Sequence, residues 1–315
     1  MIAPIELHLT SMQDWQGCGH RFELTELRGT APQSRSPKAI NGTAIHRVID
    51  QVHGHNLWEA GRETIAEFYA AAFQEAIERP VRESETGVEI AWGEHMDAAA
   101  AQAGFAGDAL AMIDGYRGDV RNRLADVVLS EAEWRATFAS RTWAGRIDQA
   151  RRLPDGTVQV VDLKSGSEKI SPTVLQLWMQ GLGYSVALEN AEFRHVGNGN
   201  GEWKPLRLSV SRVTWLHLRD YIPYLRGGKT KSGGQYKAGE VRGPAFYNLE
   251  VTDQTKRSVL REMQLFSEAI EAGRFERRPS VYQCSRCKVT VACLREFGVP
   301  EGATSDVEVN GEDYE

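Results

Sequence analysis

Two short segments near the middle of the chain carry side chains that could bind a divalent cation. G-R-I-D-Q contains Asp148, and V-V-D-L-K-S-G, further along the chain, contains Asp162 and Lys164. Residues two apart on a β-strand project from the same face, so Asp162 and Lys164 would lie together, with Leu163 opposite. Two carboxylates beside an ammonium suit Mg²⁺ or Mn²⁺, which prefer oxygen ligands. The alternative is a surface ion pair at the end of a hairpin.

The elements that would bring these acids together form a hairpin. Residues 142–153 are rich in β-branched and aromatic residues, residues 157–163 follow as T-V-Q-V-V-D-L, and the Pro-Asp-Gly sequence at 154–156 is typical of a turn. We predict two antiparallel strands that place Asp148 alongside Asp162. The apolar run before Asp162 indicates a buried strand, in which an unpaired charge is costly.

The four cysteines are the second group with chemical potential. Cys284, Cys287 and Cys293 form a C-x₂-C-x₅-C pattern, and Cys18 lies far away in the sequence. In a reducing cytosol such cysteines are metal ligands or free thiols rather than disulfides. A structural zinc site more often pairs two C-x₂-C units, so this spacing leaves the kind of site open.

The charge of the chain is unevenly distributed. The 315 residues carry 37 Lys and Arg against 43 Asp and Glu, for a formal net charge of −6. The segment 298–315 has six acids and no Lys or Arg, and without it acids and bases are equal in number. We expect this tail to be disordered. The neutral remainder argues against a protein that binds DNA mainly by bulk charge.

No apolar run is long enough to span a membrane, and the N-terminal residues lack the pattern of a signal peptide. We therefore expect a cytoplasmic protein without a membrane partner. The pattern of apolar residues and turn signals predicts the remaining elements. They are helices at 41–52, 58–79, 89–102, 105–126, 172–188 and 253–273, strands at 127–139 and 206–216, and a loop at 227–243.

Four segments in order resemble the motifs of the RecB-like branch of the PD-(D/E)XK nucleases. The hairpin segments are similar to its motifs II and III, and G-T-A-I-H-R-V-I is similar to the motif I helix, with His46 as its histidine. Q-G-L-G-Y resembles the Q-x-x-x-Y motif through Gln180 and Tyr184. Motif III carries Asp162 where many members have Glu.

This resemblance assigns roles to individual residues. It implies that Lys164 is catalytic and that Gln180 and Tyr184 position DNA or the lysine. It implies a metal site formed by His46, Asp148, Asp162 and the carbonyl of Leu163. Glu131 and Glu133 could join the metal site, but we assign them to an ordinary strand face.

The cysteine pattern resembles the iron–sulfur subgroup of the same branch, which includes AddB and the CRISPR adaptation nucleases. C-G-H-R-F is similar to that subgroup's C-P-x-R-F, with Gly19 in place of the proline. The resemblance implies a structural 4Fe–4S cluster that joins the two ends of the chain. Its ligands would be Cys18, Cys284, Cys287 and Cys293. Zinc and free thiols remain as alternatives.

The implied fold is α/β, with a central mixed β-sheet flanked by helices in a restriction-endonuclease-like core. We expect a nuclease domain at 1–297, with a helical insertion at about 55–127 and a core at about 128–215, followed by the tail at 298–315.

The implied function is a metal-dependent DNA nuclease, an exonuclease on single strands or opened ends. It would serve recombination, repair or phage DNA metabolism, with a helicase or recombination partner. One alternative is a non-catalytic DNA-binding scaffold subunit of a helicase–nuclease complex. The presence of Asp148, Asp162 and Lys164 together argues against it. The other is a zinc-stapled interaction module.

Overall fold

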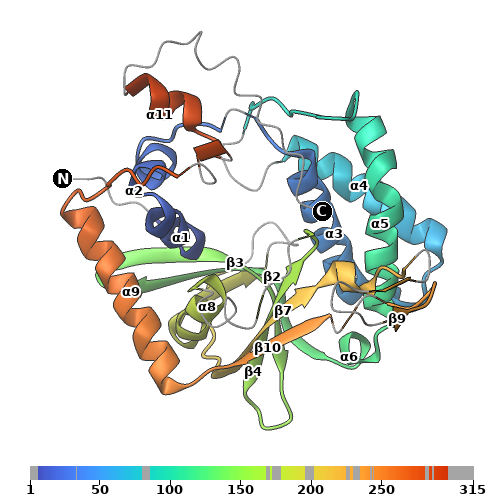
Figure 1. The fold of residues 1–315 in the computed structure, drawn as a ribbon. Helices are drawn as coiled ribbons and strands as arrows, with labels where there is room; N and C mark the ends of the chain where they lie inside the picture. Colours follow the sequence, from blue (N-terminus) through green and yellow to red (C-terminus); the bar gives the residue numbers. More distant parts are fainter. Residues whose placement is uncertain are drawn as a thin grey trace.

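A mixed β-sheet runs through the centre of the molecule, with helices on both of its faces (Figure 1). This is the predicted α/β architecture. The computed structural model describes residues 6–32, 34–79, 86–167, 171, 179–195, 202–224, 228–229, 235–241, 243, 245–280, 284–285 and 287–296.

The sheet has the strand order β10-β7-β4-β3-β2-β5-β6, and β1 also pairs with β3. Pairing is parallel between β4 and β7 and between β1 and β3, and antiparallel elsewhere. The strands are β1 (Leu7–His8), β2 (Asp126–Phe138), β3 (Arg141–Arg152), β4 (Val158–Lys164), β5 (Glu192–His195), β6 (Lys204–Pro205), β7 (Val210–His217) and β10 (Phe246–Glu250). A separate two-stranded sheet pairs β8 (Gly228–Lys229) with β9 (Gln235–Tyr236).

The predicted hairpin of β3 and β4 is confirmed. Gly156 has a φ of +82°, a conformation that suits glycine, and Asp155 accepts a hydrogen bond from the backbone N–H of Thr157 at 2.9 Å. The last paired residues at the other end are Gln149 and Val161. Asp148 and Asp162 therefore lie just beyond the point where the two strands stop pairing.

Two hydrophobic cores cover the two faces of the sheet. One packs α1 (Leu9–Gly17), α8 (Met179–Asn190) and α9 (Asp253–Glu271) against the sheet through residues such as Trp134 and Val160. The other packs α3 (Pro37–Gly54), α4 (Arg62–Glu78) and α5 (Ala98–Gly118) against Val161 and Leu163. Successive residues of β4 thus enter opposite cores, as the strand alternation requires. The shorter helices are α2 (Gly19–Phe22), η1 (Glu23–Leu27), η2 (Leu57–Glu59), α6 (Val120–Arg123), η5 (Leu218–Tyr221) and α11 (Thr290–Glu296).

The helical prediction was wrong for 89–97 and for the break before 105, and residues 98–102 form the first turn of α5. The backbone of Glu89 and Ala91 instead pairs with Arg35, and the long helix α5 begins only after Asp97, whose carboxylate caps the N–H of Ala100 at 2.8 Å. Gly104 does not interrupt the helix. A Cβ there would lie 2.8 Å from Cε1 of His95, so the glycine admits that ring.

Other boundaries also moved. Strand β7 begins at Val210 rather than at 206, and α3 extends the predicted helix at 41–52 on both sides. Residues 172–178 of the predicted helix lie outside the described residues, as does the acidic tail at 298–315, whereas α8 covers the rest of that helix. No described helix combines the length and the apolar character that crossing a membrane requires.

The N-terminal and C-terminal parts of the described chain lie side by side, where α2 meets α11 (Figure 1). His20 Nε2 lies 3.2 Å from a carboxylate oxygen of Glu296, and Arg28 pairs with the same carboxylate. This contact brings the segment of Cys18 next to the C-terminal cysteines.

Candidate active site

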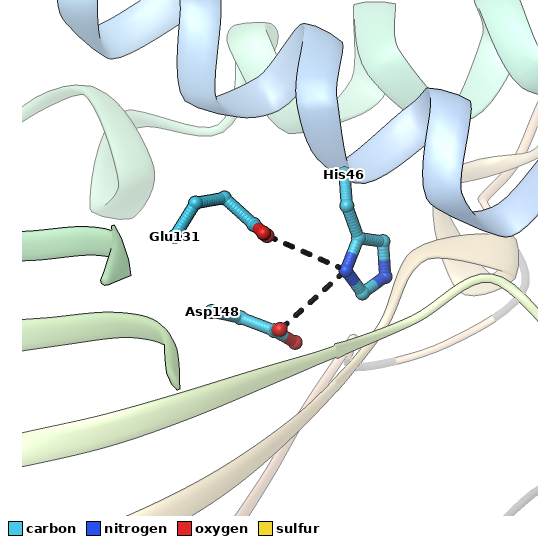
Figure 2. Close-up of side chains that lie close together, drawn as sticks. All are labelled: His46, Glu131 and Asp148. Carbon is cyan, nitrogen blue, oxygen red and sulfur yellow. Dashed lines mark ion pairs between the residues drawn. The ribbon is translucent and has the colours of Figure 1, made fainter. Parts of the chain in front are cut away.

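The side chains of His46, Glu131 and Asp148 come from separate elements and converge, as Figure 2 shows. They lie at the open end of the β3–β4 hairpin, away from its turn. Nδ1 of His46 lies 3.5 Å from Oδ1 of Asp148 and 3.7 Å from Oε1 of Glu131. Within the part of the chain that the structure describes, this is the group that brings three potential metal-ligand atoms within 4.8 Å of one another. An imidazole nitrogen and two carboxylates are a suitable ligand set for a divalent cation.

Helix α3 positions His46. The adjacent Ile45 and, one turn later, Ile49 are buried in the core that α3, α4 and α5 form against the sheet. This burial fixes the rotation of α3 about its axis. His46 then points from the helix toward β2 and β3 (Figure 2). Its side chain keeps 21% of its surface exposed, so the site is open to solvent.

A local distortion of β2 directs Glu131 into the site. Glu131 has a φ of +44°, a strained conformation for a residue with a side chain. It lies between the pairs Ser130–Gln149 and Ala132–Ile147, opposite Asp148. Leu129 and Ala132, although three residues apart, belong to the same core, so the strand alternation is interrupted at this point.

Asp148 connects the site to β4. Its Oδ2 accepts a hydrogen bond from the backbone N–H of Leu163 at 2.7 Å, where β3 and β4 have stopped pairing. Oδ2 of Asp148 thus accepts the hydrogen bond that a backbone carbonyl of a paired strand would otherwise accept from Leu163. The other oxygen, Oδ1, remains directed at His46. This arrangement fixes the separation between the metal-ligand group and the end of β4.

Asp162 and Lys164 share one face of β4, as the strand period predicts. Oδ2 of Asp162 lies 2.5 Å from Nζ of Lys164, and Asp162 is only 3% exposed. Lys164 also lies 5.2 Å from the ring centre of Trp215. Asp162 lies outside the compact three-residue group, which contains Glu131.

The charges of the site perturb one another strongly. Burial opposes the charged form of His46, but the carboxylates of Asp148 and Glu131 outweigh it and raise its pKa to about 10. Burial raises the pKa of Asp162 to about 6, with Lys164 opposing and Asp148 adding to the shift. The pKa of Lys164 is raised despite its burial, because Asp162 and Asp148 favour the ammonium.

Gln180 and Tyr184 connect α8 to the strand that carries Asp148. The Tyr184 hydroxyl donates to the backbone carbonyl of Arg146 at 2.9 Å, and Gln180 Nε2 donates to Tyr184 at 3.2 Å. Burial raises the pKa of Tyr184 well above its usual range, so it remains a donor. Both side chains therefore support β3 two residues before Asp148.

An unsatisfied atom indicates that the site fits a metal ion. Oε1 of Glu131 is buried and accepts no hydrogen bond from any described residue. Nδ1 of His46, at 3.7 Å, is too distant to hydrogen-bond with this oxygen, and a bound cation would satisfy it. His46, Glu131 and Asp148 would be the residues that hold such a cation.

The four cysteines line one cavity between the N-terminal and C-terminal parts of the described chain. Burial and the neighbouring sulfurs raise the pKa of Cys293, and Arg277 opposes the shift. No three of these sulfurs lie within 4.8 Å of one another, since the only described group that meets this condition is the one at His46. Four thiols around one cavity are a donor set for a metal ion or a cluster.

Comparison with known proteins identifies the family. A family model described as the PD-(D/E)XK nuclease superfamily matches residues 8–294, so the chain belongs to this superfamily. No curated protein matches the chain.

Two solved structures are similar in outline. A candidate exonuclease from Eubacterium rectale has a TM-score of 0.46 at 10% identity, over 90% of this chain and 87% of that chain. A protein designated SSO0001 has a TM-score of 0.29 at 10% identity, over 90% of this chain and 94% of that chain.

Proposed function

We propose that this protein is a metal-dependent deoxyribonuclease that hydrolyses phosphodiester bonds at the end of the β3–β4 hairpin. One observation carries the proposal: the His46, Glu131 and Asp148 group lies beside the ion pair of the buried Asp162 and the partly exposed Lys164. A superfamily of nucleases and a site with both metal ligands and a cationic side chain support the same reaction class.

A divalent cation held by His46, Glu131 and Asp148 would polarise the scissile phosphate and lower the pKa of water. Lys164 enters the reaction as a cation, because its pKa is raised. As an ammonium it donates hydrogen bonds to the phosphate or to the attacking water. Asp162 holds the ammonium at 2.5 Å and limits its freedom.

The proposed substrate is DNA with single strands or opened ends, processed by exonuclease action in recombination, repair or phage DNA metabolism. The RecB-like order of the motifs, with Gln180 and Tyr184 after the hairpin, supports this choice. A structural neighbour described as a candidate exonuclease agrees with it in name.

We further propose that Cys18, Cys284, Cys287 and Cys293 hold a 4Fe–4S cluster, which places the chain in the iron–sulfur subgroup. Their common cavity and the resemblance of the C-x₂-C-x₅-C pattern with a distant Cys18 to the iron–sulfur subgroup support a cluster over zinc. The role would be structural, because the ligands come from segments that are distant in sequence and a shared cluster restricts the unfolded chain.

A cleavage assay tests the function. Single- and double-stranded DNA, labelled at the 5′ or 3′ end, should be degraded with Mg²⁺ or Mn²⁺ and remain intact with EDTA. Asp162→Ala and Lys164→Ala should each reduce the rate by about 100-fold or more, because each removes several kcal/mol of stabilisation of the transition state. Asp126→Ala, which removes an exposed acid of β2, is the control. Wild-type cleavage by Asp162→Ala would remove the active site from this hairpin.

A further inference from the structure

A chain of buried polar groups runs behind the end of β4. The hydroxyl of Tyr247 donates to Oδ2 of Asp220 at 2.9 Å, and Oδ1 of Asp220 lies 3.3 Å from Nδ1 of His217. Asp220 is 0% exposed and His217 is 1% exposed. Burial of such groups is costly unless they are paired. The hydrogen bond from Tyr247 holds Asp220, and the short contact between Oδ1 and Nδ1 places the carboxylate beside the ring of His217.

The second ring nitrogen of His217 reaches the segment that follows Lys164. Nε2 lies 2.9 Å from the backbone carbonyl of Gly166. A carbonyl only accepts, so Nε2 carries the hydrogen and donates it. His217 is also the register partner of Lys164 across the parallel pairing of β4 and β7. The backbone N–H of His217 donates to the carbonyl of Ala245, so the contact of His217 with the turn after β4 is made by its side chain.

The same turn also contacts the helix that carries His46. A Cβ on Gly42 would lie 3.0 Å from Oγ of Ser165, so α3 approaches the turn closely at this glycine. His46 follows Gly42 by about one helical turn. The turn at Ser165 and Gly166 is therefore held between His217 on one side and α3 on the other.

Given the proposed nuclease function, we propose that His217, oriented by Asp220, is a positioning residue for Lys164. By holding the carbonyl of Gly166, it fixes the backbone that aims the ammonium at Asp162 and at the metal-ligand group. Its side-chain hydrogen bond goes to Gly166 and not to the ammonium, so its effect passes through the position of Lys164. Displacement of a catalytic group by about 1 Å can cost about 100-fold in rate.

Two amide substitutions separate this role from simple stability. In His217→Gln the amide nitrogen can occupy the position of Nε2 and still donate to Gly166. In His217→Asn the shorter side chain keeps Asp220 as its partner and loses Gly166. For the protein with Mg²⁺, we expect His217→Asn to lower kcat about 10- to 100-fold with an unchanged KM for DNA, and His217→Gln to retain most of kcat. An equal loss in both variants would overturn the proposal.

Thr214 provides a matched control on the same strand. It is fully buried, and its Oγ1 donates to Asn248 on β10 at 2.7 Å. Thr214→Val should lower the free energy of unfolding without changing kcat. If an amide variant does not fold, Tyr247→Phe removes only the outer hydrogen bond to Asp220 and should lower kcat to a smaller extent. An unchanged kcat in that variant would also contradict the role.

A double-mutant cycle shows whether His217 acts through Lys164. In a Lys164→Ala background, His217→Asn should cause no further loss of kcat, although the loss in stability should be the same as in the wild type. Losses in kcat that add in full would overturn the proposal. Wild-type cleavage by Lys164→Ala alone would instead contradict the proposed nuclease site.

Discussion

Glu131 lies opposite Asp148 in the antiparallel pairing of β2 and β3, and the two carboxylates face the same ring nitrogen of His46. The pairing places them on neighbouring strands, and the positive φ of Glu131 turns its side chain toward the helix. Two acids so close together repel each other unless a cation lies between them. The protonated imidazole provides that positive charge in the metal-free protein.

Replacement of Glu131 tests whether it is a metal ligand. Glu131→Gln keeps the size of the side chain and removes its charge, so we expect the affinity for Mn²⁺ to fall by about 10-fold or more, since one carboxylate ligand is lost. Cleavage at limiting Mn²⁺ should fall in parallel. Glu133→Gln, two residues along β2 and paired with Arg194, should change neither quantity. Isothermal titration measures both affinities, and equal values for the two variants would assign Glu131 to the fold alone.

Proton release on metal binding tests His46. Because its pKa is about 10 in the metal-free protein, the imidazole is protonated at pH 8 and must lose that proton to bind a cation. We expect the wild type to release about one proton more at pH 8 than His46→Asn does. Calorimetry in two buffers of different ionisation enthalpy gives this number. Equal release by both proteins would show that His46 stays outside the metal site.

The hairpin that carries Asp148 and Asp162 was predictable because a Pro-Asp-Gly turn marks it and β-branched residues flank it. The register that places Glu131 opposite Asp148 was not. It depends on the turn at Ala139 and Ser140, which have φ values of +47° and +58°. Such turns usually contain Gly, Asn or Asp, so these two residues give no signal. The positive φ of Glu131 itself is a tertiary effect.

The other differences have similar causes. Helix α5 continues through Gly104, where the ring of His95 packs against the glycine, a contact that no local pattern shows. Strands β5 and β10 were not predicted, because each has only a few residues and partners far away in the sequence. The strand face of Asp162 and Lys164 followed directly from the period of two, since it requires no distant contact.

The titration of His53 predicts a loss of stability in acid. Burial, with Arg151 adding to the effect, lowers its pKa to about 4, and its Nε2 hydrogen-bonds with Tyr116 at 2.7 Å. The folded state favours the neutral ring, so this contribution is fully present above the unfolded pKa of about 6.5 and is lost as the pH falls toward 4. Urea unfolding with EDTA at pH 7.5 and pH 5 should show a smaller drop for His53→Gln than for the wild type. His55→Gln, at an exposed site, should lose as much stability between pH 7.5 and pH 5 as the wild type. If His53→Gln also loses as much stability as the wild type, the titration of His53 does not cause the loss in acid.

Iron content tests the cysteine site. Anaerobic purification should yield about four iron atoms per chain and a brown protein, as a Cys₄ cluster requires. Cys18→Ser and Cys284→Ser should each lose the brown colour and have a lower melting temperature. Each substitution removes one cluster ligand and so breaks the connection between the N-terminal and C-terminal segments. One zinc per chain without iron would favour the zinc alternative.

Gly19 tests the same link through packing. A Cβ at this position would lie 2.9 Å from the backbone atoms of Phe275 and Glu276, which cannot move as a flexible side chain would. Gly19→Ala should therefore push Cys18 away from the C-terminal cysteines, at a cost of about 1–3 kcal/mol of stability. Iron per chain and melting temperature should both fall. Gly54→Ala is the control, since a Cβ at Gly54 meets no atom within 4 Å, and it should be neutral or slightly stabilising. Gly19→Ala could instead keep its full iron content and have the same melting temperature as Gly54→Ala. Close packing at Gly19 would then not be what holds Cys18 in place.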